Sequence, residues 1–166
     1  IVMVQCVGSR DEKFNPYCSK VCCMFALKHA VEIKDRCGPS VDVHVCYMDI
    51  RTPGKGYEDY YSRARDGDVR FVRGKPSEIF RDESNSKLRV VVEDTLENEV
   101  LELEADLVVL SVGLVPTPGT DRLAGILGIQ LDEEGFVKEV YSKLRPTETS
   151  VRGVYVCGGA QAPMDI

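Results

Sequence analysis

The feature that most constrains this chain is a group of four cysteines near its start. The stretch CVGSRDEKFNPYCSKVCC places Cys6 at the end of one apolar run, and Cys18, Cys22 and Cys23 at the start of the next. The chain has seven cysteines, an odd number at uneven spacing. Because no secretory signal is visible, we expect reduced thiols that bind a metal or do redox chemistry, rather than a disulfide framework.

The residues around these cysteines predict a strand, a loop and a helix. Residues 1–6 (IVMVQC) have the composition of a buried parallel strand. Asn15 is the expected N-cap and Pro16 the first residue of a helix that runs to about Arg36. Residues 41–47 (VDVHVCY) alternate as a strand does. This order is typical of the first half of a Rossmann-like α/β fold with a parallel sheet.

Later segments predict more strands and a short helix. Residues 77–105 contain apolar runs separated by turn-forming residues, as in an antiparallel meander. A strongly apolar strand is expected at residues 106–114, and the sequence VPTPGT that follows indicates a linker or crossover. Beyond it we expect a helix at residues 121–127 and a last strand, GVYVC, at residues 153–157.

Composition and charge exclude several classes of function. The 166 residues are 43% hydrophobic and 29% charged, as in globular proteins, and the net charge is −6. A negative chain is a poor partner for nucleic acid or anionic membranes, and no apolar run reaches the roughly 20 residues of a membrane span. The chain begins within an expected strand, without an initiator methionine. We therefore expect a cytoplasmic location and a piece of a longer protein.

The cysteine set leaves three interpretations open. A nucleotide-binding loop would carry G-x-G-x-x-G after the first strand, but this loop holds only Gly8. Four thiolates near a positive helix end suit an iron-sulfur cluster. A zinc site or a redox dithiol is the second interpretation, although adjacent ligands are awkward around one small ion. Buried cysteines that only pack between a helix and a sheet are the third.

Two segments carry a family resemblance. CVGSRDEKFNPYCSKVCCMFALKHA and YMDIRTPGKGYEDYY closely resemble the A subunit of heterodisulfide reductase, the flavin and iron-sulfur component found in methanogens and other anaerobes. The resemblance implies that Cys6, Cys18, Cys22 and Cys23 ligate a four-iron four-sulfur cluster within a thioredoxin-reductase-like scaffold. It also implies two domains: a pyridine-nucleotide-domain-like unit at residues 1–114, and the C-terminal portion of a split FAD-binding domain at residues 115–166.

The resemblance also indicates flavin contacts. ADLVVLSVGLVPTPGT, which contains Gly113, resembles the segment by which such flavoproteins return to their FAD domain. TSVRGVYVCGGAQAP resembles their second FAD motif, which makes Gly158, Gly159, Ala160 and Gln161 candidate contacts. Gly159 stands where an aspartate is expected, and the alternative for this Gly-Gly is an ordinary turn.

The function implied by the resemblance is electron relay between FAD and iron-sulfur clusters, for reduction of the CoM-CoB heterodisulfide or a related acceptor. The implied partners are the B and C subunits of the reductase and a donor such as a hydrogenase component, and the piece alone is expected to be inactive. Two rivals are an NAD(P)H-dependent disulfide oxidoreductase that uses Cys22 and Cys23 as a dithiol, and a non-catalytic zinc module. No residue is a candidate general acid or base.

The glycine-rich unit that binds the FAD pyrophosphate in this family is not within the sequence. We therefore predict that the chain by itself binds FAD weakly or not at all. The measurement is the flavin content of the purified protein, read from its visible absorption. A stoichiometric amount of flavin retained through purification would contradict the prediction.

Overall fold

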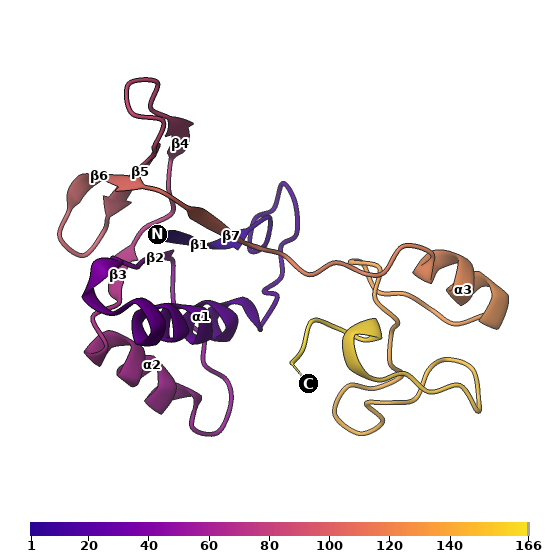
Figure 1. Ribbon diagram of the computed structural model, residues 1–166. Coiled ribbons are helices and arrows are strands. Elements are labelled where there is room, and N and C mark those ends of the chain that lie inside the picture. The colour runs from indigo at the N-terminus through magenta and orange to yellow at the C-terminus, as the bar shows by residue number, and fades with distance from the viewer. Residues whose placement is uncertain (166) are drawn as a thin grey trace. The chain divides into compact units, whose positions relative to one another are not determined.

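A computed structural model describes residues 1–165 of the chain, which divide into two compact units (Figure 1). Unit 1 consists of residues 1–9 and 22–113, and unit 2 consists of residues 10–21 and, within the described part of the chain, 114–165. The loop that leaves the first strand therefore belongs to unit 2, although the strand and the helix on either side of it belong to unit 1.

A parallel sheet lies at the centre of unit 1. Its strands are β1 (Val2–Val7), β2 (His44–Tyr47), β3 (Arg70–Arg73) and β7 (Val108–Val112), in the order β3-β2-β1-β7. Strand β1 pairs in parallel with both β2 and β7, which makes it an inner strand. A continuous apolar run suits this position because both faces of an inner parallel strand are covered.

Two different layers cover the two faces of this sheet. On one face, Met3 and Val45 share a core cluster with Ala26 and Ala30 of α1 (Cys22–Cys37). Helix α2 (Tyr57–Asp66) also packs there, because its Tyr61 ring lies 5.1 Å from that of Phe71. A 3-10 turn at Gly38–Ser40 follows α1.

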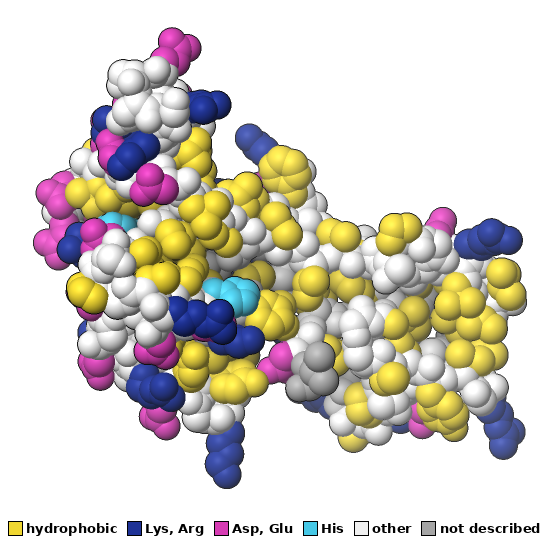
Figure 2. Space-filling view, viewed as in Figure 1, with side chains coloured by type: hydrophobic (Ala, Val, Ile, Leu, Met, Phe, Trp, Pro, Cys, Tyr) yellow, Lys and Arg dark blue, Asp and Glu magenta, His cyan; other side chains and the backbone are white. Residues whose placement is uncertain are grey.

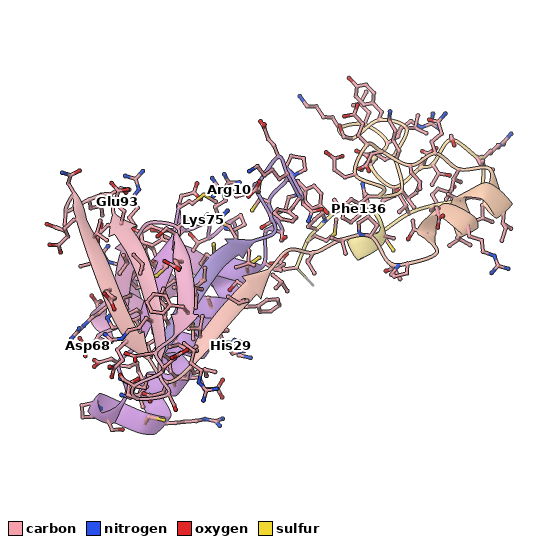
Figure 3. All side chains as sticks on the ribbon, turned by 90° about the horizontal axis from the view of Figure 1, so that it is seen from above. Arg10, His29, Asp68, Lys75, Glu93 and Phe136 are labelled. Carbon is pink, nitrogen blue, oxygen red and sulfur yellow. The ribbon has the colours of Figure 1, made fainter. Side chains whose placement is uncertain are left out.

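The other face is covered by an antiparallel sheet. Its strands are β4 (Glu78–Arg81), β5 (Leu88–Asp94) and β6 (Glu99–Ala105), in sequential order. Val2 and Val4 of β1 share a core cluster with Val90 and Val92 of β5. In Figure 3, Glu93 lies on this sheet and Asp68 in the turn after α2. The predicted α/β class, with a parallel sheet and an antiparallel meander, is confirmed.

The predicted start of the first helix was wrong. Helix α1 begins at Cys22, not at Pro16, so Cys18 lies outside it. The tertiary contacts of the preceding loop override the Asn-Pro signal: Asn15 Oδ1 accepts the Tyr17 hydroxyl instead of capping a helix, and Ser19 Oγ accepts the Leu114 N–H at 2.8 Å. Lys20 has a φ of 62°, which no continuous helix allows. Cys18 and Cys22 therefore do not lie on the same helix.

Unit 2 has little regular structure. It contains α3 (Thr120–Leu127), as expected, and a 3-10 turn at Gly158–Ala160. The last predicted strand was wrong, because residues 153–157 make only one isolated bridge, between Tyr155 and Glu148. An apolar run forms a strand only where a neighbouring segment pairs with it along its length. In the described part of unit 2, this run is paired at one position only. Figure 2 shows hydrophobic side chains on the visible face over α3, where Leu123 and Ile126 are exposed.

Gly74 is required where β3 leaves the parallel sheet. A Cβ at this position would lie 2.0 Å from the backbone oxygen of Glu93. The same junction is held by Thr95, whose N–H and hydroxyl both donate to the Arg73 carbonyl, at 2.9 and 2.7 Å. The backbone at both sides is therefore fixed and cannot move to admit a methyl group.

We predict that Gly74→Ala lowers the free energy of unfolding by about 1–3 kcal/mol, the range for overpacking. Urea-induced unfolding followed by circular dichroism measures it. The control is Gly125→Ala in α3, where no described atom outside the adjacent residues and the helix's own backbone lies within 4 Å of the added Cβ, so stability should stay the same or rise. Equal effects of the two substitutions would contradict the prediction.

Candidate metal centre

Cys6 lies where β1 departs from regular strand geometry. Its side chain is 6% exposed and its φ is 59°, a left-handed conformation that costs a residue with a Cβ on the order of 1–3 kcal/mol. The pairing of β1 with β7 shifts register between Val4 and Val7, and the Ser9 N–H donates to the Cys6 carbonyl at 3.3 Å. The backbone therefore holds Cys6 at a kink near the carboxyl edge of the sheet.

Cys18 lies in the loop of unit 2. The loop is closed by backbone hydrogen bonds from Arg10 to Tyr17 and from Asp11 to Asn15, at 2.9 and 3.0 Å. Cys18 Sγ accepts the Lys20 N–H at 3.3 Å, a bond that would be strengthened by negative charge on the sulfur.

Cys22 and Cys23 are the first two residues of α1. They lie at the N-terminal end of the helix. This end carries a partial positive charge, which favours a thiolate over a thiol. Cys23 is 7% exposed and lies on the buried face with Ala26 and Ala30, and its thiol is 4.0 Å from the Asp49 carbonyl. Cys22 is half-buried.

The reasoning from sequence missed Gln5. Its side chain is only 3% exposed, and within residues 1–165 neither its amide nitrogen nor its amide oxygen has a hydrogen-bond partner. A buried amide without partners costs several kcal/mol, on the order of 1–3 per unsatisfied group. The signal that would have found it is a glutamine inside the otherwise apolar run IVMVQC.

The ligand atoms of the four cysteines, and not their arrangement, are what match a metal cluster. Among the described residues, no three Cys, His, Asp or Glu side chains are arranged so that they could hold a metal ion. The structure thus places Cys22 and Cys23 together at the start of α1, but it does not gather the predicted ligands into one coordination shell. As a donor set, four thiols are what a four-iron four-sulfur cluster requires. The ligand assignment therefore stays a prediction.

The other cysteines differ from this set in position. Cys37, at the far end of α1, is exposed, and so is Cys157. Cys46 lies in β2 within the core between the two sheets. Burial, with a smaller contribution from Asp94, raises the pKa of the Cys46 thiol to about 12. Cys46 is therefore a packing residue and not a nucleophile at physiological pH.

Gly113, one of the candidate flavin contacts, has a packing role in unit 1. Its N–H donates to the Val7 carbonyl at 2.9 Å, which extends the β1–β7 pairing by one residue. A Cβ on Gly113 would lie 3.0 Å from the Gly8 oxygen and 3.2 Å from Ser9 Cβ. A glycine here lets the loop after β1 pass close to the end of β7.

The other candidate flavin contacts form the turn at the end of unit 2. Gly158 has a φ of 64°, and no described atom beyond the adjacent residues lies within 4 Å of a Cβ built on Gly158 or Gly159. The Ala160 carbonyl accepts the Val137 N–H at 2.9 Å, and Gln161 Nε2 donates to the Pro146 carbonyl at 2.6 Å. The two glycines are thus accessible to a ligand, whereas these groups of Ala160 and Gln161 already hold the loop. Their role toward FAD stays a prediction.

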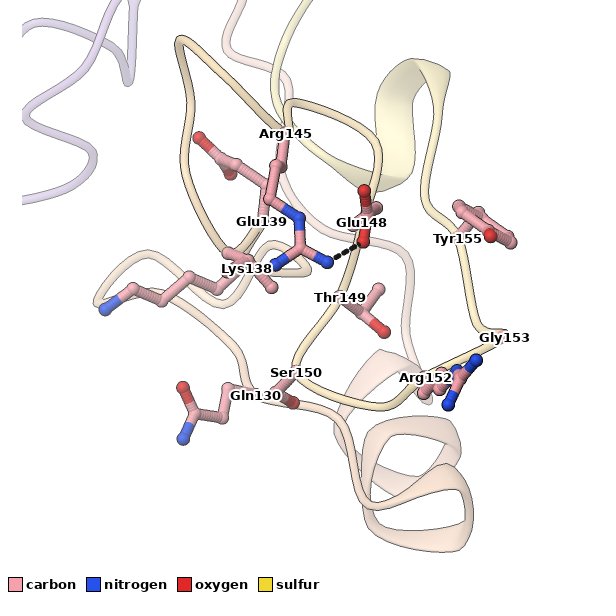
Figure 4. A pocket seen from close by; sticks show the side chains of 11 residues that line it. Gln130, Lys138, Glu139, Arg145, Glu148, Thr149, Ser150, Arg152, Gly153 and Tyr155 are labelled. Carbon is pink, nitrogen blue, oxygen red and sulfur yellow. Dashed lines mark hydrogen bonds and ion pairs between the residues drawn. The ribbon is translucent and has the colours of Figure 1, made fainter.

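Unit 2 also has an open pocket of about 670 Å³ (Figure 4). Lys138, Arg145, Glu148, Arg152 and Tyr155 are among the residues that line it. Arg145 and Glu148 form an ion pair across it, which lowers the pKa of the Glu148 carboxyl. None of the predicted site residues lines this pocket.

Curated relatives match the chain over its whole length. The A subunit of the H2/formate:CoB-CoM heterodisulfide,ferredoxin reductase of Methanococcus maripaludis is 55% identical over 167 residues, 99% of this chain and 25% of the relative. The iron-sulfur A subunit of the CoB-CoM heterodisulfide reductase of Methanocaldococcus jannaschii is 53% identical over 168 residues, 100% of this chain and 25% of the relative. The chain therefore matches one segment of the A subunit of heterodisulfide reductase. The predicted resemblance is confirmed, and the chain spans about a quarter of the length of these relatives.

Solved structures agree with the predicted thioredoxin-reductase-like fold. Thioredoxin reductase from Lactococcus lactis has a TM-score of 0.59 and 19% identity, covering 99% of this chain and 45% of that structure. The enzyme from T. acidophilum has a TM-score of 0.55 and 21% identity, covering 97% and 44%. No protein-family model matches the chain. Through residue 165, no helix has both the length and the apolar character to span a bilayer.

The burial of Cys46 gives a prediction about thiol reactivity. Because the thiolate is the reactive form, Cys46 should resist alkylation by iodoacetamide at about pH 8, well below its pKa of about 12. The exposed Cys37 and Cys157 should be alkylated. Mass spectrometry of proteolytic peptides measures each site, and all three should react in urea. Equal rates for Cys46 and Cys37 in the folded chain would overturn this expectation.

Proposed function

We propose that this chain holds a four-iron four-sulfur cluster on Cys6, Cys18, Cys22 and Cys23 and works as an electron relay. The observation that carries the proposal is the 53% identity, over the whole chain, to a relative named as the iron-sulfur A subunit of CoB-CoM heterodisulfide reductase. The positions of the thiols support it. Cys6 is the last residue but one of a buried strand, and Cys22 and Cys23 start the helix that follows that strand in unit 1.

Each residue contributes a distinct property to such a site. The start of α1 favours negative charge on Cys22 and Cys23. The Lys20 N–H stabilises a thiolate at Cys18, and the burial of Cys6 and Cys23 keeps water away from their sulfurs. When bound, the cluster would supply reversible storage of one electron.

In the longer proteins, the proposed role is transfer of electrons between FAD and iron-sulfur clusters. The whole activity would be reduction of the CoM-CoB heterodisulfide, with the B and C subunits as partners. The names of two relatives also include H2, formate and ferredoxin, so we propose a partner that oxidises H2 or formate as the electron source. Gly158 and Gly159 would approach the flavin with their backbone, because no side chain covers them.

Anaerobic reconstitution of the full chain with iron and sulfide tests the cluster. We predict about four iron and four sulfide per chain, a broad brown absorption, and a paramagnetic signal on reduction. Cys18→Ser and Cys22→Ser should each lose most of the bound iron. Metal analysis, visible spectra and electron paramagnetic resonance measure these outcomes.

The matched control is Cys37→Ser, which changes a cysteine at the other end of the same helix. It should bind as much iron as the unaltered chain. A colourless protein with one zinc per chain would contradict the proposal and favour the zinc module. Equal loss of iron in Cys37→Ser and Cys22→Ser would contradict the ligand assignment.

A further inference from the structure

The packing of unit 1 does not by itself explain why the polar side chain of Gln5 is buried. Both polar atoms of its amide are buried, and no described residue offers them a hydrogen bond. Buried polar groups in native proteins are nearly always paired, with protein, water or a ligand. The neighbouring positions of β1 are Val4, which belongs to the core, and Cys6, which is buried at the kink.

The geometry of β1 and α1 places Gln5 beside the first turn of that helix. Side chains alternate along a strand, so Gln5 is on the same face as Met3, which shares a core cluster with Ala26 and Ala30. Two residues along a strand cover about 6.6 Å. Four residues back along the helix cover about 6 Å.

Helix α1 runs in the direction opposite to β1. The step along β1 from Met3 to Gln5 is therefore matched, on the helix, by the step back from Ala26 to Cys22. The amide is thus at the level of Cys22 and Cys23, next in sequence to Cys6. Three of the four thiols of the donor set thus belong to the same compact unit as Gln5.

The chemistry of an amide matches what an iron-sulfur centre accepts. The amide nitrogen has two N–H donors, and the sulfurs of a cluster carry negative charge and accept hydrogen bonds. Hydrogen bonds to these sulfurs are among the factors that set the reduction potential of a cluster. A donor stabilises the reduced cluster more than the oxidised one, because the reduced cluster carries one more negative charge.

We propose that Gln5 is a positioning residue of the cluster, whose amide N–H donates to a cluster or thiolate sulfur and raises the reduction potential. This proposal rests on the proposed function, since it requires the cluster. It assigns a role to a residue that is not a ligand, and it explains why a glutamine occupies a strand that is otherwise apolar.

Redox titration of the reconstituted full chain tests the proposal. Gln5→Met keeps the length of the side chain and removes the donor. We expect the same iron content and a reduction equilibrium about tenfold less favourable, which is a shift of roughly 59 mV to lower potential for a one-electron couple. Gln5→Leu also lacks a donor and should shift the potential in the same direction. This second variant keeps the test valid if Gln5→Met does not fold.

The control is Met3→Leu, a change of packing on the same face of the same strand, which should leave the potential unchanged. If Gln5 were only a buried side chain, Gln5→Met would change the stability toward urea but not the potential. An unchanged potential in both Gln5 variants would overturn the proposal. Absence of a cluster in the unaltered chain would instead refute the proposed function, so the two failures are distinguishable.

Discussion

The parallel pairing of β1 between β2 and β7 is the constraint on which the rest of unit 1 depends. A strand that pairs in parallel with the next one requires the chain to cross back, and here the crossover is α1. The crossover brings the carboxyl end of β1 and the positive end of α1 to one edge of the sheet. Core clusters on both faces of β1 fix its register, because a slip by one residue would exchange Met3 with Val4.

This edge is where the chain departs from a nucleotide-binding unit. In the dinucleotide folds, glycines at this place let the backbone approach a pyrophosphate. Here the first residue beyond regular strand geometry is Cys6, and the helix opens with Cys22 and Cys23. The same positive helix end that would bind a phosphate can stabilise thiolates. The partial positive charge is thus kept, while the groups that face the ligand change from backbone N–H groups to cysteine sulfurs.

Sequence patterns predicted most of the fold of unit 1 because its strands are periodic and buried. Strands β5 and β6 were predictable from their apolar runs and from the turn residues between them. The loop before α1 was not predictable, because Ser19 and Tyr17 bond to Leu114, 95 and 97 residues away. A local Asn-Pro signal carries no information about such distant partners. For the candidate site, the sequence indicated the donor atoms, but burial and hydrogen bonding, which single out Gln5, are properties of the packed chain.

Two unfavourable features are adjacent in β1: Gln5 buries an amide that no described residue pairs, and Cys6 adopts a left-handed backbone. The left-handed backbone, and each of the two amide groups, costs on the order of 1–3 kcal/mol, in a domain whose whole stability is typically about 5–15 kcal/mol. Elsewhere β1 follows every local rule, with Val2, Met3 and Val4 buried in well-packed clusters. Natural sequences tend to break local rules where function demands it. A ligand with sulfur acceptors at this edge would pair the amide and use the kink to aim Cys6, which accounts for both features with one cause.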